Sequence, residues 1–354
     1  MEETSNLKKK IAPIVKHYNL EPYFVESMGN IIKVYSNKGI FALKKMNPHQ
    51  GIDFIRHIQI LYQKGYNRIV PIYPTFDGRY AVLHDQNLYY LMPWLENEKK
   101  NMNIEQYQQL FRELARLHSL SVREVSVNKE ERKNHYEKTL ADLEQEEEFL
   151  AGYLVTCERN VYMSPFELLF CSYYHDINQA FSYSKRRLKE WFEAAKDHEK
   201  ERIVITHGKI SNEHFLYDDK GYGYFINFEQ ANESSPLHDL LPFLAKSLRG
   251  FPKRSEELVE WIYTYFKYFP LKEHEMHLFL SYLAHPGPVT ETVEYFFKEG
   301  KNRNERKAVQ KLLRDYWLLK NTEFIVARID ETERQIKLQQ EAQNEAQNEA
   351  QNEQ

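Results

Sequence analysis

The sequence predicts an α+β protein of two lobes, a small β-rich lobe followed by a large, mainly helical one. Short apolar runs separated by turn residues fill most of residues 22–94. From residue 103 onward, apolar residues recur instead at helical spacing. A strand-like island, residues 203–229, interrupts the helical part. This order of elements is typical of two lobes that each have their own core.

The small lobe is assigned to residues 1–95. Its predicted helices are residues 7–20 and 51–65, and its predicted strands are residues 23–35, 39–46, 69–74, 79–84 and 88–94. Turn residues Ser36 to Gly39 and the pair Asp77-Gly78 separate neighbouring strands. Paired strands, one helix and further strands therefore make up this lobe.

The large lobe is assigned to residues 103–340, after a polar hinge at 96–102. Its first predicted helices are residues 104–121, 130–152 and 163–197. Ser164 and Pro165 have the residue types of a helix cap and first helical position. Helices follow the strand-like island up to about residue 340.

The last segment, residues 341–354, repeats Glu-Ala-Gln-Asn. Its four-residue period places the glutamates about one helical turn apart, where they repel one another mildly. Alanine is its only apolar residue, so the segment has no large apolar side chain that could form a core. We expect a disordered tail; a helix that binds a partner is the alternative.

Composition excludes several classes of function. With 48 basic and 52 acidic residues, the net charge of −4 predicts neither nucleic acid nor an anionic membrane as a partner. Two cysteines, Cys157 and Cys171, indicate neither a disulfide framework nor a zinc module. The sequence contains no apolar run of about 20 residues, and its beginning lacks the apolar core of a signal peptide. Synthesis in the cytosol is therefore expected.

The segment from Ile205 to Leu216, followed by residues 224–229, has the layout of a phosphotransferase site. An apolar strand leads to a His207-Gly208 turn, a short loop and a hairpin that ends in polar residues. Phosphoryl transfer requires a base or orienting carboxylate, ligands for Mg²⁺ and a cation at the nucleotide phosphates. The order of residues here matches the places where such groups stand.

These segments resemble the aminoglycoside phosphotransferase and choline kinase branch of the protein-kinase-like fold, whose loop reads H-G-D-x-x-x-x-N before a strand that ends in D-[FW]-[ED]. Further matches in the expected order are Phe41-Ala42-Leu43-Lys44, Leu114-Ala115-Arg116-Leu117-His118 and Leu237-His238-Asp239-Leu240. The resemblance implies a bilobal kinase-like fold. It also implies that Asp239 binds backbone amides of the turn, that His207 supports the turn and that His118 packs behind it.

The chain departs from that pattern at the positions of the base and of the metal ligands. Lys209 stands at the base position, and an ammonium cannot accept a proton unless its pKa falls by several units. His214 and Asn227 stand at the metal-ligand positions, although Mg²⁺ prefers carboxylates. Only Glu229 remains acidic. Lys209 is expected to pair with Glu229 in place of a metal; binding of nucleotide phosphates is the alternative.

The small lobe departs from the pattern as well. Between residues 26 and 34 there is a single glycine, Gly29, whereas a phosphate-cradling loop needs several. The predicted helix 51–65 lacks the glutamate that would pair with Lys44. Lys44 is therefore either an ordinary lysine of an edge strand or a phosphate ligand. Lys44 and Glu229 are the candidate nucleotide-binding residues.

A narrower resemblance is to the CotS-related spore coat proteins of endospore-forming bacteria. It rests on the residues 75–78, 89–94 and 282–286 and on the altered loop, and it covers about residues 10–335. It implies synthesis in the mother-cell cytoplasm, deposition in the spore coat and other coat proteins as partners. The resemblance does not indicate the oligomeric state of the protein.

The resulting hypothesis is a non-catalytic, kinase-like structural component of the coat, with no cofactor and no metal. The alternatives are a nucleotide-binding switch without transfer and an atypical small-molecule or protein kinase with a rearranged metal site. Both alternatives would use ATP, and the kinase would also use Mg²⁺.

Overall fold

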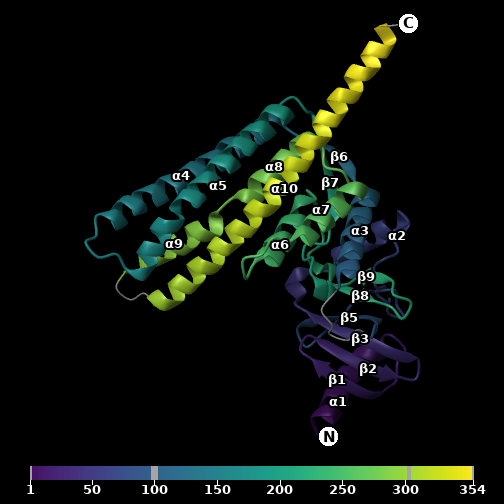
Figure 1. The fold of residues 1–354 in the computed structure, drawn as a ribbon. Coiled ribbons are helices and arrows are strands. Elements are labelled where there is room, and N and C mark those ends of the chain that lie inside the picture. Colours follow the sequence, from purple (N-terminus) through teal and green to yellow (C-terminus); the bar gives the residue numbers. More distant parts are fainter. Residues whose placement is uncertain (1, 97–102, 301–303, 353–354) are drawn as a thin grey trace. The chain divides into compact units, whose positions relative to one another are not determined.

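The computed structural model describes residues 2–96, 103–300 and 304–352, which form two compact units (Figure 1). The first comprises the chain up to residue 123 together with 203–239, and the second comprises 124–202 together with 240–354. This division differs from the predicted boundary, because the helix after the hinge and the strand-like island belong with the N-terminal sheet. Residues 97–102 of the predicted hinge lie outside the described residues.

The first unit is built on an antiparallel five-stranded sheet of order β1-β2-β3-β5-β4. The strands are β1 (Pro22–Met28), β2 (Ile31–Ser36), β3 (Gly39–Met46), β4 (Val82–His84) and β5 (Asn87–Pro93). The predicted strand 23–35 is two strands, since Gly29 adopts a positive φ of 67° and turns the chain. The predicted strand 69–74 is limited to isolated bridges at Ile69 and Tyr73.

Helices of the first unit cover and extend this sheet. Helix α1 (Glu2–Lys16) packs Ile11, Ile14 and Val15 against apolar residues of the sheet. Helix α2 (Phe54–Gln63) contacts α3 (Ile104–Ser121), which begins with a capping box at Asn103. Both helices confirm the sequence prediction to within a few residues.

The strand-like island consists of short elements that carry the candidate site. They are β7 (Lys200–Thr206), β8 (Phe215–Tyr217), β9 (Gly223–Phe225), β10 (Asn232–Ser234), and the short 3-10 helices η2 (Asn212–His214) and η3 (Phe228–Gln230). Strand β10 pairs with β7, which also adjoins β6 (Arg123–Ser126), and β8 pairs with β9. These pairings bring residue 207 and residues 226–232 to the same end of the island.

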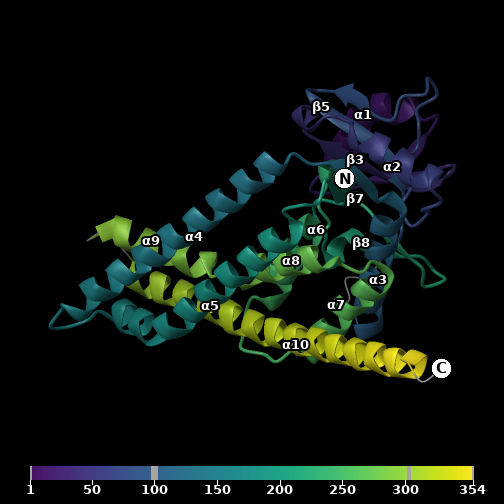
Figure 2. The same ribbon diagram turned by 90° about the horizontal axis from the view of Figure 1, so that it is seen from above.

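The second unit is helical. Its helices are α4 (Lys129–Glu158), α5 (Pro165–Ala195), α6 (Leu237–Leu248), which starts in the first unit, α7 (Glu256–Tyr268), α8 (Glu273–Ala284), α9 (Gly287–Glu299) and α10 (Glu305–Asn352). Ser164 caps α5 and Pro165 opens it, as predicted. Helices α4 and α5 form a long pair, and α10 runs beside α5 in both views (Figures 1 and 2). In the described part of the chain, no helix combines the length and apolar character needed to cross a bilayer.

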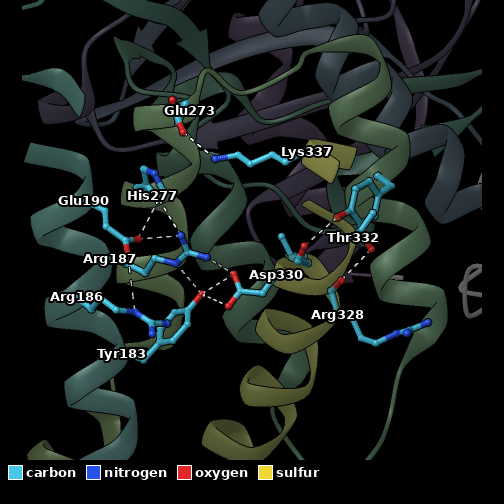
Figure 3. Close-up of polar contacts among 12 residues, drawn as sticks. Tyr183, Arg186, Arg187, Glu190, Glu273, His277, Arg328, Asp330, Thr332 and Lys337 are labelled. Atoms are coloured by element: carbon cyan, nitrogen blue, oxygen red, sulfur yellow. Dashed lines mark hydrogen bonds and ion pairs between the residues drawn. The ribbon is translucent and has the colours of Figure 1, made fainter. Parts of the chain in front are cut away.

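A polar cluster holds α10 against α5 and α8 (Figure 3). The hydroxyl of Tyr183 donates to Asp330 at 2.8–2.9 Å, and the Arg187 guanidinium also binds Asp330. Arg187 donates further to Glu190 and to Nδ1 of His277, both at 2.9 Å. Because Arg187 has partners on three helices, this cluster fixes the register of α10 in the second unit.

Helix α10 continues through residues 341–352, which differs from the predicted disordered tail. Glutamate, alanine and glutamine have high helix propensities. A helix that has already formed also extends at little cost, because only its first turn carries the nucleation penalty. Residues 341–352 are therefore helical, which was the alternative form for this segment.

Candidate active site

The His207-Gly208 turn follows β7 and approaches the backbone of η3 closely. Gly208 has a φ of 79°, and a Cβ atom added there would lie 2.1 Å from the carbonyl oxygen of Gln230. Both the backbone angle and the available space therefore require glycine.

A buried carboxylate anchors this turn. Asp239 accepts hydrogen bonds from the backbone N–H groups of His207 at 2.7 Å and of Gly208 at 2.8 Å. Nε2 of His118 lies 3.1 Å from the same carboxylate, and both side chains are fully buried. Burial raises the pKa of Asp239, but the hydrogen bonds outweigh this effect and the net pKa lies below its usual range. Asp239 thus makes the contacts that the resemblance implied.

His207 joins the turn to the end of β9. Its Nε2 lies 2.7 Å from the carbonyl oxygen of Ile226, and its Nδ1 accepts from the backbone N–H of Lys209 at 3.2 Å. These contacts require the neutral ring, with the proton on Nε2. Complete burial lowers the pKa of His207 to about 4, so the ring stays neutral at neutral pH.

Lys44 occupies the position between the polar residues that follow β9. Its Nζ donates to Oδ1 of Asn227 and forms an ion pair with Glu229. The hydroxyl of Tyr90 donates to the same carboxylate oxygen of Glu229. The Lys44 and Glu229 side chains are only 13% and 10% exposed. Burial raises the pKa of Glu229, but Lys44 and Tyr90 outweigh it, so the carboxylate is ionised.

The local fold explains this arrangement. Asn227 adopts the left-handed conformation, with φ 69° and ψ 50°, which asparagine tolerates better than most residues. This bend directs Asn227 and Glu229 to the same side as Lys44. Lys44 and Tyr90 are cross-strand partners in β3 and β5. Strand β3 is internal to the sheet, so the edge-strand alternative for Lys44 is wrong.

Lys209 and His214 lie on the loop beside this ion pair. Nδ1 of His214 lies 2.7 Å from the carbonyl oxygen of Lys209, and the His214 ring stacks on that of His207 at 5.9 Å. Burial lowers the pKa of His214, which therefore stays neutral. Among the described residues the ion-pair partner of Glu229 is Lys44, not Lys209 as expected. Burial lowers the pKa of Lys44, and the charge of Lys209 lowers it further, while Glu229 opposes both effects.

A polar cavity of about 290 Å³ opens next to these residues. It is lined by Lys44, Lys45, Lys209, His214, Asn227 and Glu229, with residues 30, 46, 47 and 230 completing the wall. The lining contains three lysines and one carboxylate. The electrostatic character of the cavity is therefore basic, which suits an anion better than a divalent cation.

The donor set does not fit Mg²⁺. The ion prefers several oxygen ligands, usually carboxylates and water, in octahedral geometry. Here one carboxylate and one amide oxygen are both bonded to an ammonium group, and the remaining metal-ligand position is a neutral imidazole. No grouping of three or more His, Cys, Asp or Glu residues suited to a metal occurs in the described residues.

Fold and loop together define a protein-kinase-like protein with a phosphotransferase-type loop. Residues 79–278, more than half of the chain, match the model of the ecdysteroid kinase-like family, and the chain belongs to that family. No curated protein matches the chain significantly.

Solved structures show the same fold. An aminoglycoside phosphotransferase from Alicyclobacillus acidocaldarius has a TM-score of 0.66 and 15% identity, covering 90% of this chain and 95% of the other. A spectinomycin phosphotransferase, solved with ADP and spectinomycin, has a TM-score of 0.53 and 12% identity, covering 90% and 98%. At these identities the likeness establishes the fold alone.

Tyr90 was not predicted as a residue of the site, although its hydroxyl binds Glu229. The signal that could have found it is strand register, because residues paired across β3 and β5 share one face of the sheet. The sequence did single out Lys44, His207, Lys209, His214, Asn227, Glu229 and Asp239, and the structure brings all seven into the first unit around one turn.

We expect Gly208→Ala to destabilise the protein far more than Gly221→Ala. Both glycines have a φ of 79°, but nothing lies within 4 Å of a Cβ at position 221. The backbone angle alone should cost about 1–2 kcal/mol in either variant. The clash with Gln230 should add about 2 kcal/mol or more at position 208. Urea unfolding of both variants measures the difference, and equal losses would contradict the close approach.

Proposed function

We propose that this chain is a non-catalytic, kinase-like protein that acts by binding other proteins. The observation that carries the proposal is the Lys44 ammonium, which binds both Asn227 and Glu229. In phosphotransferases of this architecture, groups at such positions hold the metal, and a lysine binds the nucleotide phosphates. Here those roles are joined into one internal ion pair, and a lysine stands where the base is needed.

We further propose that the binding role is exercised in the coat of bacterial spores. Support for this location comes from the sequence resemblance, in particular the segments 75–78, 89–94 and 282–286. We expect a fluorescent fusion of the full chain, expressed in a sporulating endospore-former, to accumulate around the forespore and to be extracted with the coat proteins. A diffuse signal in the mother cell throughout sporulation would refute this location.

Lys44→Met tests the internal ion pair. If Lys44 serves to neutralise Glu229, the variant leaves a mostly buried carboxylate without its cation. Its free energy of unfolding should then be lower than that of the wild type by about 2–3 kcal/mol. Lys45→Met, a change at the next residue of β3, should lose less than about 0.5 kcal/mol. Urea unfolding monitored by circular dichroism measures both.

Radiolabelled ATP with Mg²⁺ provides the catalytic arm of the same experiment. We expect the wild type to transfer no phosphate from ATP to itself or to water. The pair Lys209→Asp and Asn227→Asp restores a base and a metal carboxylate, and asks whether only these groups are missing. Transfer by the wild type that Glu229→Ala abolishes would overturn the proposal in favour of a kinase with a rearranged metal site.

A second candidate function is nucleotide binding without transfer, favoured by the basic cavity. Lys45 and Lys209 line it without belonging to the Lys44 ion pair. Among the matched structures, the spectinomycin phosphotransferase was solved with ADP and, separately, with AMP. A ligand held by lysines rather than through a metal should bind without Mg²⁺.

The expected result for this second function is an ATP-induced rise in the unfolding temperature that is as large in EDTA as in Mg²⁺. Lys209→Ala should reduce the rise, because one of the lining cations is removed, whereas the exposed-loop variant Lys38→Ala should not. No rise at millimolar ATP would exclude the nucleotide switch and leave the protein-binding role unaffected.

A further inference from the structure

The helical unit contains an apolar cavity that is separate from the candidate site. The cavity has a volume of about 270 Å³ and is lined by residues of α6, of the turn from α8 to α9 and of α10. All of its lining residues belong to the second unit. Because an apolar cavity of about 150 Å³ is enough to hold benzene, this cavity can hold a small molecule of two fused rings.

The wall of this cavity is mainly apolar and is built partly from rigid residues. Nine of the thirteen lining residues are leucine, proline, valine or alanine. Three of them are prolines, Pro242 in α6 and Pro286 and Pro288 at the start of α9. The proline ring fixes φ, so the backbone at these positions adjusts less readily to fill the space. Such a wall favours a ligand with an apolar body.

Asp315 of α10 is the carboxylate in this lining, and its side chain is only 12% exposed. Its Oδ2 accepts a hydrogen bond from the Thr292 hydroxyl at 2.6 Å and another from the Lys311 ammonium at 3.1 Å. Within residues 2–96, 103–300 and 304–352, no side chain or backbone group donates to its Oδ1. Asp315 therefore has an acceptor atom available for a ligand.

The charge of Asp315 decides which kind of donor suits it. Lys311 already provides the opposite charge. A second cation in the cavity would lose its hydration without meeting an uncompensated carboxylate. A neutral N–H or O–H group instead loses little on leaving water and gains a hydrogen bond to a charged acceptor.

Two further polar groups of the wall already have partners. Nε2 of His285 lies 2.9 Å from the carboxylate of Glu146. The hydroxyl of Tyr282 lies 2.7 Å from Nε2 of His135. Of the three side chains Tyr282, His285 and Asp315, Asp315 is thus the one that best suits a donor on the ligand.

We propose that this cavity binds a neutral, planar aromatic molecule of one or two rings that carries an N–H or O–H donor. The rings pack against the leucine and proline wall, and the donor binds Oδ1 of Asp315. The inference is independent of the function proposed above, because none of the lining residues belongs to the candidate site.

The first test compares indole with benzofuran, which has the same two-ring shape but no N–H group. Both are titrated into the full wild-type chain in a calorimeter. We expect indole to bind, and benzofuran to bind about tenfold more weakly or less, because it cannot donate a hydrogen bond to a carboxylate. Indole should also slow amide hydrogen exchange in residues 241–245, 283–289 and 315–322.

The second test fills the cavity. Ala245→Leu adds three carbon atoms to its wall and should weaken indole binding at least about tenfold. The matched control is Ala327→Leu, which changes the wall of a different cavity, of about 310 Å³, in the same unit. It should leave the affinity for indole unchanged. Leucine has a high helix propensity, which suits both positions.

Three results would overturn the inference. They are no binding of indole at millimolar concentration by the wild type, equal affinities for indole and benzofuran, and an affinity for indole that Ala245→Leu leaves unchanged. The titrations and the hydrogen exchange of the wild type require no variant, so misfolding of Ala245→Leu does not remove the test.

Discussion

The geometry of the candidate site depends on the hydrogen bonds that the Asp239 carboxylate accepts from the His207-Gly208 turn. Its side chain is completely buried, and it binds two backbone amides and the His118 ring. Removing a carboxylate from water is costly unless its lone pairs are satisfied. Because the donors belong to the His207-Gly208 turn and to α3, that cost is recovered only when the turn has its observed conformation. The conformation in turn directs His207 to Ile226 and sets the position of Asn227 and Glu229.

The same logic explains why the shape of the site survives without its acids. The turn is determined by Gly208, His207 and Asp239, none of which needs a metal or a substrate to be stable. Two of the residues that differ from the phosphotransferase pattern, Lys209 and His214, lie on the loop that follows the turn. Substitution there changes the chemistry of the cavity and leaves the supporting hydrogen bonds unchanged.

Much of the fold and the membership of the site could be predicted from the sequence, because both depend on local signals. Turn glycines, helix caps such as Ser164 and the order of motifs along the chain are readable one segment at a time. The pairing of Glu229 was not, since it depends on which lysine lies closer in three dimensions. Lys209 is 20 residues away in sequence and Lys44 is 185 residues away, yet it is Lys44 that makes the contact. Only the strand register and the left-handed bend at Asn227 decide between them.

Lys44 belongs to the ion pair with Glu229 and also lines the basic cavity, and these two roles conflict. Lys44 cannot neutralise Glu229 and serve a phosphate group equally well, because moving its ammonium away would leave a carboxylate that is only 10% exposed without its cation. Losing the partner of such a charge costs on the order of 3 kcal/mol, roughly a hundredfold in an equilibrium constant. An anion bound in this cavity would therefore interact first with Lys209 and Lys45 and leave the Lys44–Glu229 pair intact. In protein kinases, acidic and amide side chains hold the metal ions, and the strand lysine lies at the nucleotide phosphates. In this protein the Lys44 ammonium instead binds both Asn227 and Glu229.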